Sequence, residues 1–167
     1  MQRRNQADYK SLYLKAANYC AYQDRCIHEV HEKLSKWGLE EEKIPVAIEQ
    51  LQEEKYLDQE RYTRSYARGK FYYQKWGKIK IRQALKLKQV DESLIQKAMN
   101  EEIKADDYDR VLTRILYKKY HQLFKEEDLY KRKMKTVQHA AQKGYEPNVI
   151  YALIDEAIQM NEDDFEF

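Results

Sequence analysis

The chain has 167 residues, of which 36% are charged and 43% are hydrophobic, and its formal net charge is only +2. It contains four Gly and two Pro. Few turn formers and many helix formers favour an all-α protein. No apolar run approaches the ~20 residues of a membrane-spanning helix, and no hydrophobic signal segment is present near the N-terminus, so we expect a cytoplasmic protein without a membrane partner.

Three helices are predicted in residues 8–57. The first occupies about residues 8–21. The second carries apolar residues at helical spacing and is followed by Gly38, where a left-handed C-terminal cap is expected. The third starts near Pro45, whose fixed φ suits a first turn. The residues expected to be buried on the second and third helices are Ile27, Val30, Leu34, Trp37, Ile44, Ile48 and Leu51.

Residues 61–90 contain ten positive charges and no Asp or Glu, although the whole chain sums to +2. The positive charge is therefore concentrated, which indicates a polyanionic partner. The candidate contacts are Arg61, Arg64, Arg68, Lys70, Lys75, Lys78, Lys80, Arg82, Lys86 and Lys88.

A helical arrangement separates these charges from a packing face. If Asp58 caps a helix that continues through Lys75, one basic stripe contains Arg61, Arg64, Arg68 and Lys75. A separate stripe, expected to pack against another helix, contains Tyr62, Tyr66, Gly69 and Tyr73. After Gly77, a second helix is expected to bury Ile81, Ala84 and Leu85 and to expose Lys78, Arg82 and Lys86. The alternative is two ordinary amphipathic helices with solvated outer faces, but helix surfaces usually mix charges of both signs.

The rest of the chain continues the helical pattern. Asp91 is expected to cap a helix, Gly144 to end a long one, and Pro147 to open the last. The apolar positions of these helices are Leu94, Ile95, Ala98, Met99, Ile103, Tyr108, Val111, Leu112, Ile115, Leu116, Leu129, Tyr130, Met134, Val137, Ala140, Ala141, Val149, Ile150, Leu153, Ile154, Ala157 and Ile158. Leu34, Leu85, Leu112, Val137 and Leu153 are predicted core positions.

A unit of helix, turn and helix occurs three times, at offsets of 51 and 55 residues when Leu34, Leu85 and Ala140 are aligned. The simplest architecture is an elongated tandem array of three three-helix repeats. The predicted repeats are residues 8–57, 58–104 and 105–160, followed by an acidic tail, residues 161–167. This tail is either a solvated end or a competitor with the partner for the basic region.

No catalytic or metal-binding motif emerges. His28, His31 and Glu32 could share a helix face, but no second group of metal ligands accompanies them. Cys20 and Cys26 are six residues apart, which fits neither a zinc site nor a redox pair, and they are interpreted as reduced structural thiols. No Gly-rich phosphate loop is present. We therefore expect no enzyme activity, no metal and no cofactor.

The order of several motifs resembles the RecX family of recombination regulators. These motifs are residues 55–62 (Lys-Tyr-Leu-Asp-Gln-Glu-Arg-Tyr), residues 75–81 (Lys-Trp-Gly-Lys-Ile-Lys-Ile) followed by Leu85, and residues 26–30 (Cys-Ile-His-Glu-Val) followed by Leu34. Two positions depart from the family pattern, since Cys26 replaces the usual Ser and Gln89 the usual Gly. Both positions lie at helix ends.

The resemblance implies a regulatory protein that binds RecA-type recombinase filaments on DNA and lowers ATP hydrolysis, strand exchange and coprotease activity, with roles in DNA repair and the SOS response. The protein would act as a monomer and would contact DNA weakly or through the filament. The family has no catalytic residues to carry over, so only the basic positions are candidate contacts. The alternatives are a helical-repeat DNA-binding module that acts without a recombinase, and a scaffold with an incidental charge patch.

Overall fold

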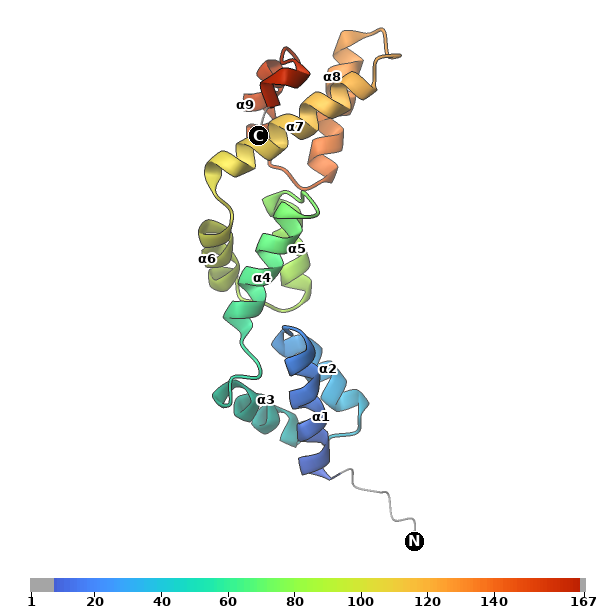
Figure 1. Ribbon diagram of the computed structural model, residues 1–167. Helices are drawn as coiled ribbons and strands as arrows, with labels where there is room; N and C mark the ends of the chain where they lie inside the picture. The colour runs from blue at the N-terminus through green and yellow to red at the C-terminus, as the bar shows by residue number, and fades with distance from the viewer. Residues whose placement is uncertain (1–7, 166–167) are drawn as a thin grey trace. The chain divides into compact units, whose positions relative to one another are not determined.

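The computed structural model describes residues 8–165, and this part of the chain is helical throughout. The elements, shown in Figure 1, are α1 (Tyr9–Tyr22), α2 (Ile27–Lys36), the short 3₁₀ helix η1 (Glu41–Lys43), α3 (Ile44–Glu53), α4 (Gln59–Tyr72), α5 (Lys78–Leu87), α6 (Glu92–Glu102), α7 (Ala105–Gln122), α8 (Leu129–Gln142), α9 (Pro147–Ala157) and the 3₁₀ helix η2 (Glu162–Phe165). Within the described residues there are nine α-helices and no strand, which confirms the predicted all-α class. The predicted elongation stays a prediction.

The chain forms two compact units whose boundary does not follow the predicted repeats. One unit comprises Met1–Ser65 and Leu85–Ile95, and the other comprises Tyr66–Ala84 and Gln96–Phe167. The boundary therefore passes through α4, α5 and α6. The basic residues 61–90 are divided between the two units, and each unit is described separately below.

The first unit is built around α1, α2 and α3. Leu34, Ile44 and Leu51 are fully buried, as predicted. Two tyrosines of α1 pack against this core while their hydroxyls bond to α3 and the residue after it: Tyr9 Oη donates to Gln50 at 3.1 Å, and Tyr13 Oη donates to Glu54 at 2.7 Å. A tyrosine supplies apolar area and a polar end together, which suits a core that lies near the surface.

The same turn joins the second and third helices of each repeat. Its central residue has a left-handed backbone, with φ of 90° at Gly38, 58° at Gln89 and 93° at Gly144. The following N–H bonds to a carbonyl five residues back at all three turns, from Leu39 to Leu34, from Val90 to Leu85 and from Tyr145 to Ala140, at 3.1 to 3.2 Å. This is the Schellman pattern of helix C-termini, and it confirms both the threefold repeat and the caps predicted at the two glycines.

Helix α4 begins as predicted but ends earlier and buries a different face. The Asp58 carboxylate caps it by accepting from the Arg61 N–H at 2.9 Å. The helix ends at Tyr72, so Lys75 is not part of it.

In the predicted packing stripe, Tyr62 is buried as expected, but Tyr66, Gly69 and Tyr73 are not core positions. Tyr66 and Gly69 are only half-buried and Tyr73 is 86% exposed, whereas Thr63, Ala67 and Phe71 are fully buried. The buried face is centred one position further along the helix than predicted, at Thr63 and Ala67, which rotates it by about 100°. Phe71 continues this face four residues later, whereas Tyr73 lies beyond the end of α4.

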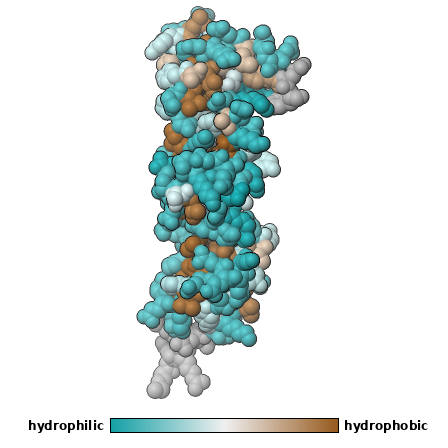
Figure 2. Space-filling view, turned by 90° about the vertical axis from the view of Figure 1, so that its left-hand side faces the viewer, coloured by the Kyte–Doolittle hydropathy of each residue, from teal (hydrophilic) through white to brown (hydrophobic). Residues whose placement is uncertain are grey.

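Helix α5 divides its faces as predicted. Ile81 and Leu85 are fully buried, while Arg82 and Lys86 are exposed. Within residues 8–165, no helix is long and apolar enough to cross a membrane. The face of the molecule in Figure 2 is mostly hydrophilic, with small separate hydrophobic patches.

In the second unit, α7 packs against both α8 and α9, which also contact each other. Leu112 is fully buried, as predicted, and so are Leu116, Ile150 and Ile154. Val137 and Leu153 are only half-buried, which corrects their assignment to the core. The buried face of α8 instead carries Thr136 and Ala140. Three further positions expected on apolar faces are exposed, namely Leu129, Tyr130 and Ala141.

Candidate functional site

The structure places the ten predicted contact residues in both compact units. Arg61, Arg64, Lys86 and Lys88 belong to the first unit. Those in the second unit are Arg68, Lys70, Lys75, Lys78, Lys80 and Arg82. The two groups have different surroundings, so the number of positive charges in the sequence does not by itself identify a binding site.

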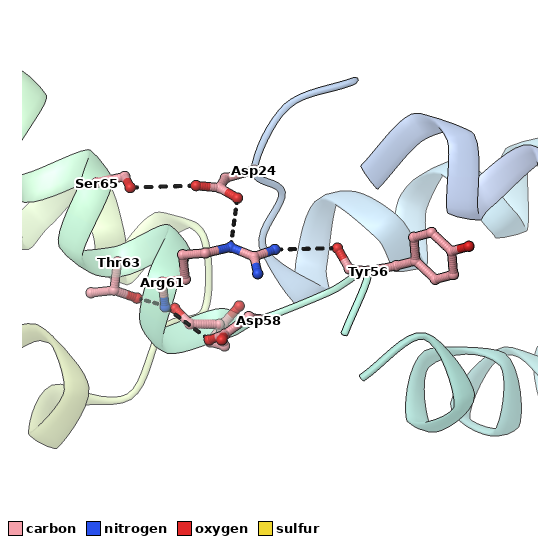
Figure 3. A network of polar contacts seen from close by, with 7 residues as sticks. Asp24, Tyr56, Asp58, Arg61, Thr63 and Ser65 are labelled. Atoms are coloured by element: carbon pink, nitrogen blue, oxygen red, sulfur yellow. Dashed lines mark hydrogen bonds and ion pairs between the residues drawn. The ribbon is translucent and has the colours of Figure 1, made fainter. Parts of the chain in front are cut away.

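In the first unit, Arg61 is bonded within the fold (Figure 3). Its Nε donates to Asp24 Oδ1 at 2.8 Å, and an Nη donates to the Tyr56 carbonyl at 3.4 Å. Ser65 Oγ donates to the other oxygen of Asp24 at 3.3 Å. Arg61 therefore ties the start of α4 to the segment before α2, and its guanidinium is engaged inside the unit.

Lys88 is also paired inside the first unit. Its Nζ donates to Glu29 at 2.6 Å and lies 6.0 Å from the centre of the Tyr62 ring. Burial alone would lower the pKa of Lys88, but the hydrogen bond from Lys88 to Glu29 and the charge of Glu29 raise it above its ordinary value. Burial would raise the pKa of Glu29, but Lys88 and the Cys26 N–H, which donates to Glu29 at 3.2 Å, lower it. Both groups are therefore charged at neutral pH.

Two more of the ten residues form ion pairs. Lys86 lies 2.9 Å from Glu92, and Arg68 of the second unit lies 3.2 Å from Glu102. The Lys86–Glu92 pair is exposed on both sides and contributes little to stability, whereas the Glu102 side chain is largely buried. In both pairs the carboxylate cancels the field of its partner at a distance.

The second unit contains four lysines with different partners, which we call the lysine cluster: Lys70, Lys75, Lys78 and Lys80. The ammonium groups of Lys70 and Lys80 each lie 4.5 Å from the centre of the half-buried Trp76 ring. Lys78 lies 4.7 Å from the Tyr108 ring, and Lys75 Nζ donates to the Tyr72 carbonyl at 2.6 Å. Within residues 8–165, no member of the cluster forms an ion pair with a carboxylate. An aromatic face attracts a cation without removing its formal charge, so the cluster stays positive.

A close backbone contact positions the turn between α4 and α5, which carries Lys75 and is flanked by the other three lysines of the cluster. Lys75 adopts a left-handed φ of 58°, and the turn then meets the turn between α8 and α9. The Gly77 N–H donates to the Lys143 carbonyl at 2.8 Å, and the Ile79 N–H donates to the Gly144 carbonyl at 3.0 Å. A Cβ on Gly77 would lie 2.2 Å from the Gly144 carbonyl carbon, so only glycine allows this approach.

Two buried tyrosines complete the support of this turn. Tyr145 Oη donates to the Lys75 carbonyl at 3.0 Å. The Lys78 N–H donates to Tyr108 Oη at 3.0 Å, and the Tyr108 hydroxyl donates to the Glu146 carboxylate. Burial raises the pKa of both tyrosines, and the hydrogen bond to Glu146 raises the pKa of Tyr108 further. Both hydroxyls therefore remain protonated and able to donate.

The support that Tyr108, Tyr145 and Glu146 give to this turn was not predicted from the sequence. The signal available was weak: Gly77 and Gly144 both lie at turns, but nothing in a single sequence indicates that two turns 67 residues apart will touch. The chain has fifteen Tyr and four Phe, and this excess also indicates polar contacts in the core, because buried hydroxyls need polar partners.

The histidines considered as metal ligands lie beside carboxylates. His28 is 3.7 Å from Glu32, and His31 is 3.6 Å from Glu41. In the part of the chain that the structure describes, no three His, Cys, Asp or Glu side chains gather as metal ligands would. Both cysteines are buried and free, and burial raises the pKa of their thiols.

Comparison with known proteins matches the three repeats to one family. Models of the first, second and third three-helix domains of RecX match residues 13–51, 58–99 and 106–154. The regulatory protein RecX of Vibrio parahaemolyticus is 38% identical over 102 residues, which cover 61% of this chain and 65% of that protein. That of Bacillus licheniformis is 28% identical over 158 residues, which cover 93% of this chain and 59% of that protein. The chain thus spans less than two thirds of the length of these relatives.

Solved structures agree on the fold. The crystal structure of RecX from Lactobacillus salivarius superposes with a TM-score of 0.82 and 22% identity, covering 90% of this chain and 97% of that one. A second RecX crystal structure gives a TM-score of 0.77 at 23% identity, covering 88% of this chain and 73% of the other. Because the three domain models follow one another in order over most of the chain, this protein belongs to the RecX family.

Proposed function

We propose that this protein regulates a RecA-type recombinase by binding its filament on DNA and lowering ATP hydrolysis, strand exchange and coprotease activity. Membership of a family whose curated members are named regulatory protein RecX supports the regulatory role. The target and the inhibitory effect rest on the resemblance given above. The structural observation that carries the proposal is the lysine cluster, which lies in the best-matched motif region and whose ammonium groups have no carboxylate partner within residues 8–165.

The cluster suits a surface that contains both phosphates and acidic side chains. The turn between α4 and α5 is fixed by Gly77, Tyr108 and Tyr145, so little backbone entropy is lost there when the lysines meet a partner. An ammonium group is a compact point charge that binds phosphate or carboxylate oxygens without a demand for planar geometry. A filament of recombinase on DNA would offer both kinds of oxygen.

All ten basic residues are proposed as contacts, and they are ranked by how far their charge is cancelled within the fold. The lysine cluster comes first, because its charge is not cancelled within the fold. Arg61 and Lys88 come last, because their ion pairs inside the first unit would have to break. The full set proposed is Arg61, Arg64, Arg68, Lys70, Lys75, Lys78, Lys80, Arg82, Lys86 and Lys88.

The test is the ATPase of a RecA-type recombinase on single-stranded DNA, with a triple variant that removes cluster charge: Lys70→Gln, Lys78→Gln and Lys80→Gln. We expect wild-type protein to inhibit. The variant should need roughly tenfold more protein for the same inhibition, because it loses three attractions to an acidic or phosphate surface. The matched control removes three lysines that are exposed elsewhere, by Lys10→Gln, Lys36→Gln and Lys125→Gln, and should inhibit like the wild type.

Two results would contradict the proposal. If the wild type leaves ATP hydrolysis and strand exchange unchanged, the regulatory target is not a recombinase filament. If the triple variant is folded by circular dichroism and inhibits like the wild type, the lysine cluster is not the contact surface.

The alternative, a DNA-binding module that acts alone, is favoured by one feature. Trp76 is half-buried, so part of its side chain is accessible, and two lysines that could contact a phosphate backbone, Lys70 and Lys80, each lie 4.5 Å from the centre of its ring. Anisotropy of a labelled single strand, without recombinase, separates the two functions. Tight binding that falls steeply with salt and is lost in the triple variant would favour this module. Weak binding together with strong inhibition of recombinase would favour the regulator.

A further inference from the structure

A groove in the second unit lies between α7 and α9. It has a volume of about 710 Å³, within the usual range for ligand pockets. Residues of α7 form one wall, and Leu153 and Glu156 of α9 form another. Met160 and two residues of η2, Asp164 and Phe165, complete the lining together with Lys75.

The chemistry of the lining is specific: an apolar floor under a mainly cationic rim. The apolar side chains are Val111, Ile115, Leu153 and Met160. The cationic side chains are Lys75, Arg110, Arg114 and Lys118. The two main walls contribute only two acidic side chains, Asp109 and Glu156. Leu153 is therefore half-exposed because it faces this groove and not the core.

Asp164 and Phe165, at the end of the described residues, already lie at this groove. The Asn161 N–H donates to the Asp164 carboxylate at 2.6 Å, and the Asp164 N–H donates to the Asn161 carbonyl at 3.1 Å, which folds the segment into a tight turn. The turn brings Asp164 and Phe165 to the groove, and the Phe165 ring lies 4.9 Å from the Tyr117 ring of α7. An acidic segment with an aromatic side chain is thus the chemistry that this surface accepts.

We propose that the groove between α7 and α9 docks an acidic peptide segment with an aromatic anchor, supplied by a protein partner, and that Glu162–Phe165 is its intramolecular competitor. The aromatic side chain would enter over the apolar floor, and the carboxylates would meet Arg114 and Lys118. About 710 Å³ remains open with the tail in place, so the tail covers the site without filling it. This docking site does not depend on the recombinase proposed above.

A fluorescein-labelled peptide with the sequence of residues 161–167 serves as the probe, and its binding is followed by anisotropy. Full-length wild type is compared with Phe165→Ala, which removes the competing ring. The variant should bind the peptide at least about fivefold more tightly, because a competing intramolecular contact typically changes affinity by a factor of this order or more. In the Phe165→Ala background, Arg114→Gln with Lys118→Gln should weaken binding at least about tenfold, and more at low salt than at high salt.

Altered peptides repeat the test without altering the groove. A peptide with Asn and Gln in place of its acids should lose the salt-dependent part of the affinity, and one with Ala in place of both Phe residues should lose most of the rest. The control protein, Lys10→Gln with Lys36→Gln in the Phe165→Ala background, should bind like Phe165→Ala alone. Absence of saturable binding to Phe165→Ala at millimolar peptide would overturn the proposal. Equal binding of the parent and altered peptides would overturn it as well.

Discussion

The basic residues of the two compact units differ in what surrounds them. In the first unit, Lys88 meets Glu29 at 2.6 Å and Arg61 meets Asp24 at 2.8 Å. In the second unit, Lys70 and Lys80 face the Trp76 ring, and Arg68 lies 3.2 Å from Glu102. The density of positive charge is similar along the sequence, but the first group makes ion pairs within the fold, whereas we propose that the lysine cluster of the second group contacts a partner.

The energies of these contacts explain why the fold tolerates both arrangements. An exposed ion pair contributes about 0 to 1 kcal/mol, and an exposed cation–π contact contributes about 0.5 to 1 kcal/mol. Neither type dominates stability, so the choice between them has little effect on the fold. It has a large effect on the field, because a lysine over a ring keeps its charge whereas an ion pair is nearly neutral at a distance.

The largest expected effect comes from Gly77→Ala, which attacks the support of the lysine cluster. The new Cβ would lie 2.2 Å from backbone atoms of Gly144, so the two turns must separate. We expect a loss of roughly 1 to 3 kcal/mol or more in the free energy of unfolding, together with a shift in Trp76 emission. The measurement is urea unfolding followed by fluorescence in a Trp37→Phe background, where Trp76 is the only tryptophan.

Gly69→Ala is the matched control for that change. Gly69 lies inside α4, and a Cβ there meets no atom within 4 Å. Alanine should therefore stabilise the helix by about 0.5 to 1 kcal/mol. Equal stability and equal emission of Gly77→Ala and the wild type would show that the two turns do not need their close contact.

The next effect contrasts one lysine from each unit. Lys88→Met leaves the partly buried Glu29 carboxylate without its cation, and we expect a loss of about 1 to 2 kcal/mol. Lys78→Met leaves only the face of Tyr108 without its cation, so its cost should stay below about 1 kcal/mol. Urea midpoints of the two variants measure the difference. A larger loss for Lys78→Met would reverse the proposed division between structural and partner-directed lysines.

The pair of Lys88 and Glu29 also has a pH signature. The pKa of Glu29 in the fold lies below its ordinary value of 4.5, so the unfolded chain takes up this proton first as the pH falls. The contribution of Glu29 to stability is therefore complete above about pH 5 and declines as the pH falls through 4.5 and below. Lys88→Met should flatten the stability profile in this acidic range, as measured by the thermal unfolding midpoint between pH 3 and 6. An unchanged profile would mean that the pair is not formed in solution.

The smallest expected effect concerns the turn at Gln89. Its φ of 58° is unfavourable for a residue with a side chain, whereas glycine occupies the equivalent position in the other two repeats. Gln89→Gly should stabilise the protein by about 0.5 to 1 kcal/mol, since relief of the left-handed strain exceeds the entropic cost of glycine. Gly38→Gln should destabilise it by a similar amount. Thermal unfolding of both variants would contradict this account if the two shifts had the same sign.

The sequence by itself determined the features that depend on local pattern. Helix existence, the Asp58 cap, the left-handed turns at Gly38 and Gly144 and the buried faces of α2, α3 and α5 were predicted and are observed. Each depends on residues within about two turns of one another, where spacing and backbone preference decide the outcome. The repeat at offsets of 51 and 55 residues followed from the same local signals.

Only the tertiary structure decided the rest. It placed Phe71 in the core instead of Tyr73, paired Lys88 with Glu29 across 59 residues, and brought Gly77 against Gly144. These outcomes depend on which surfaces meet in space, and many pairings of charge or of helix faces are compatible with one sequence pattern. The charge of residues 61–90 could therefore be counted from the sequence, but the structure decided which lysines pair with a carboxylate, such as Lys88 with Glu29, and which lie over an aromatic ring, such as Lys78 over Tyr108.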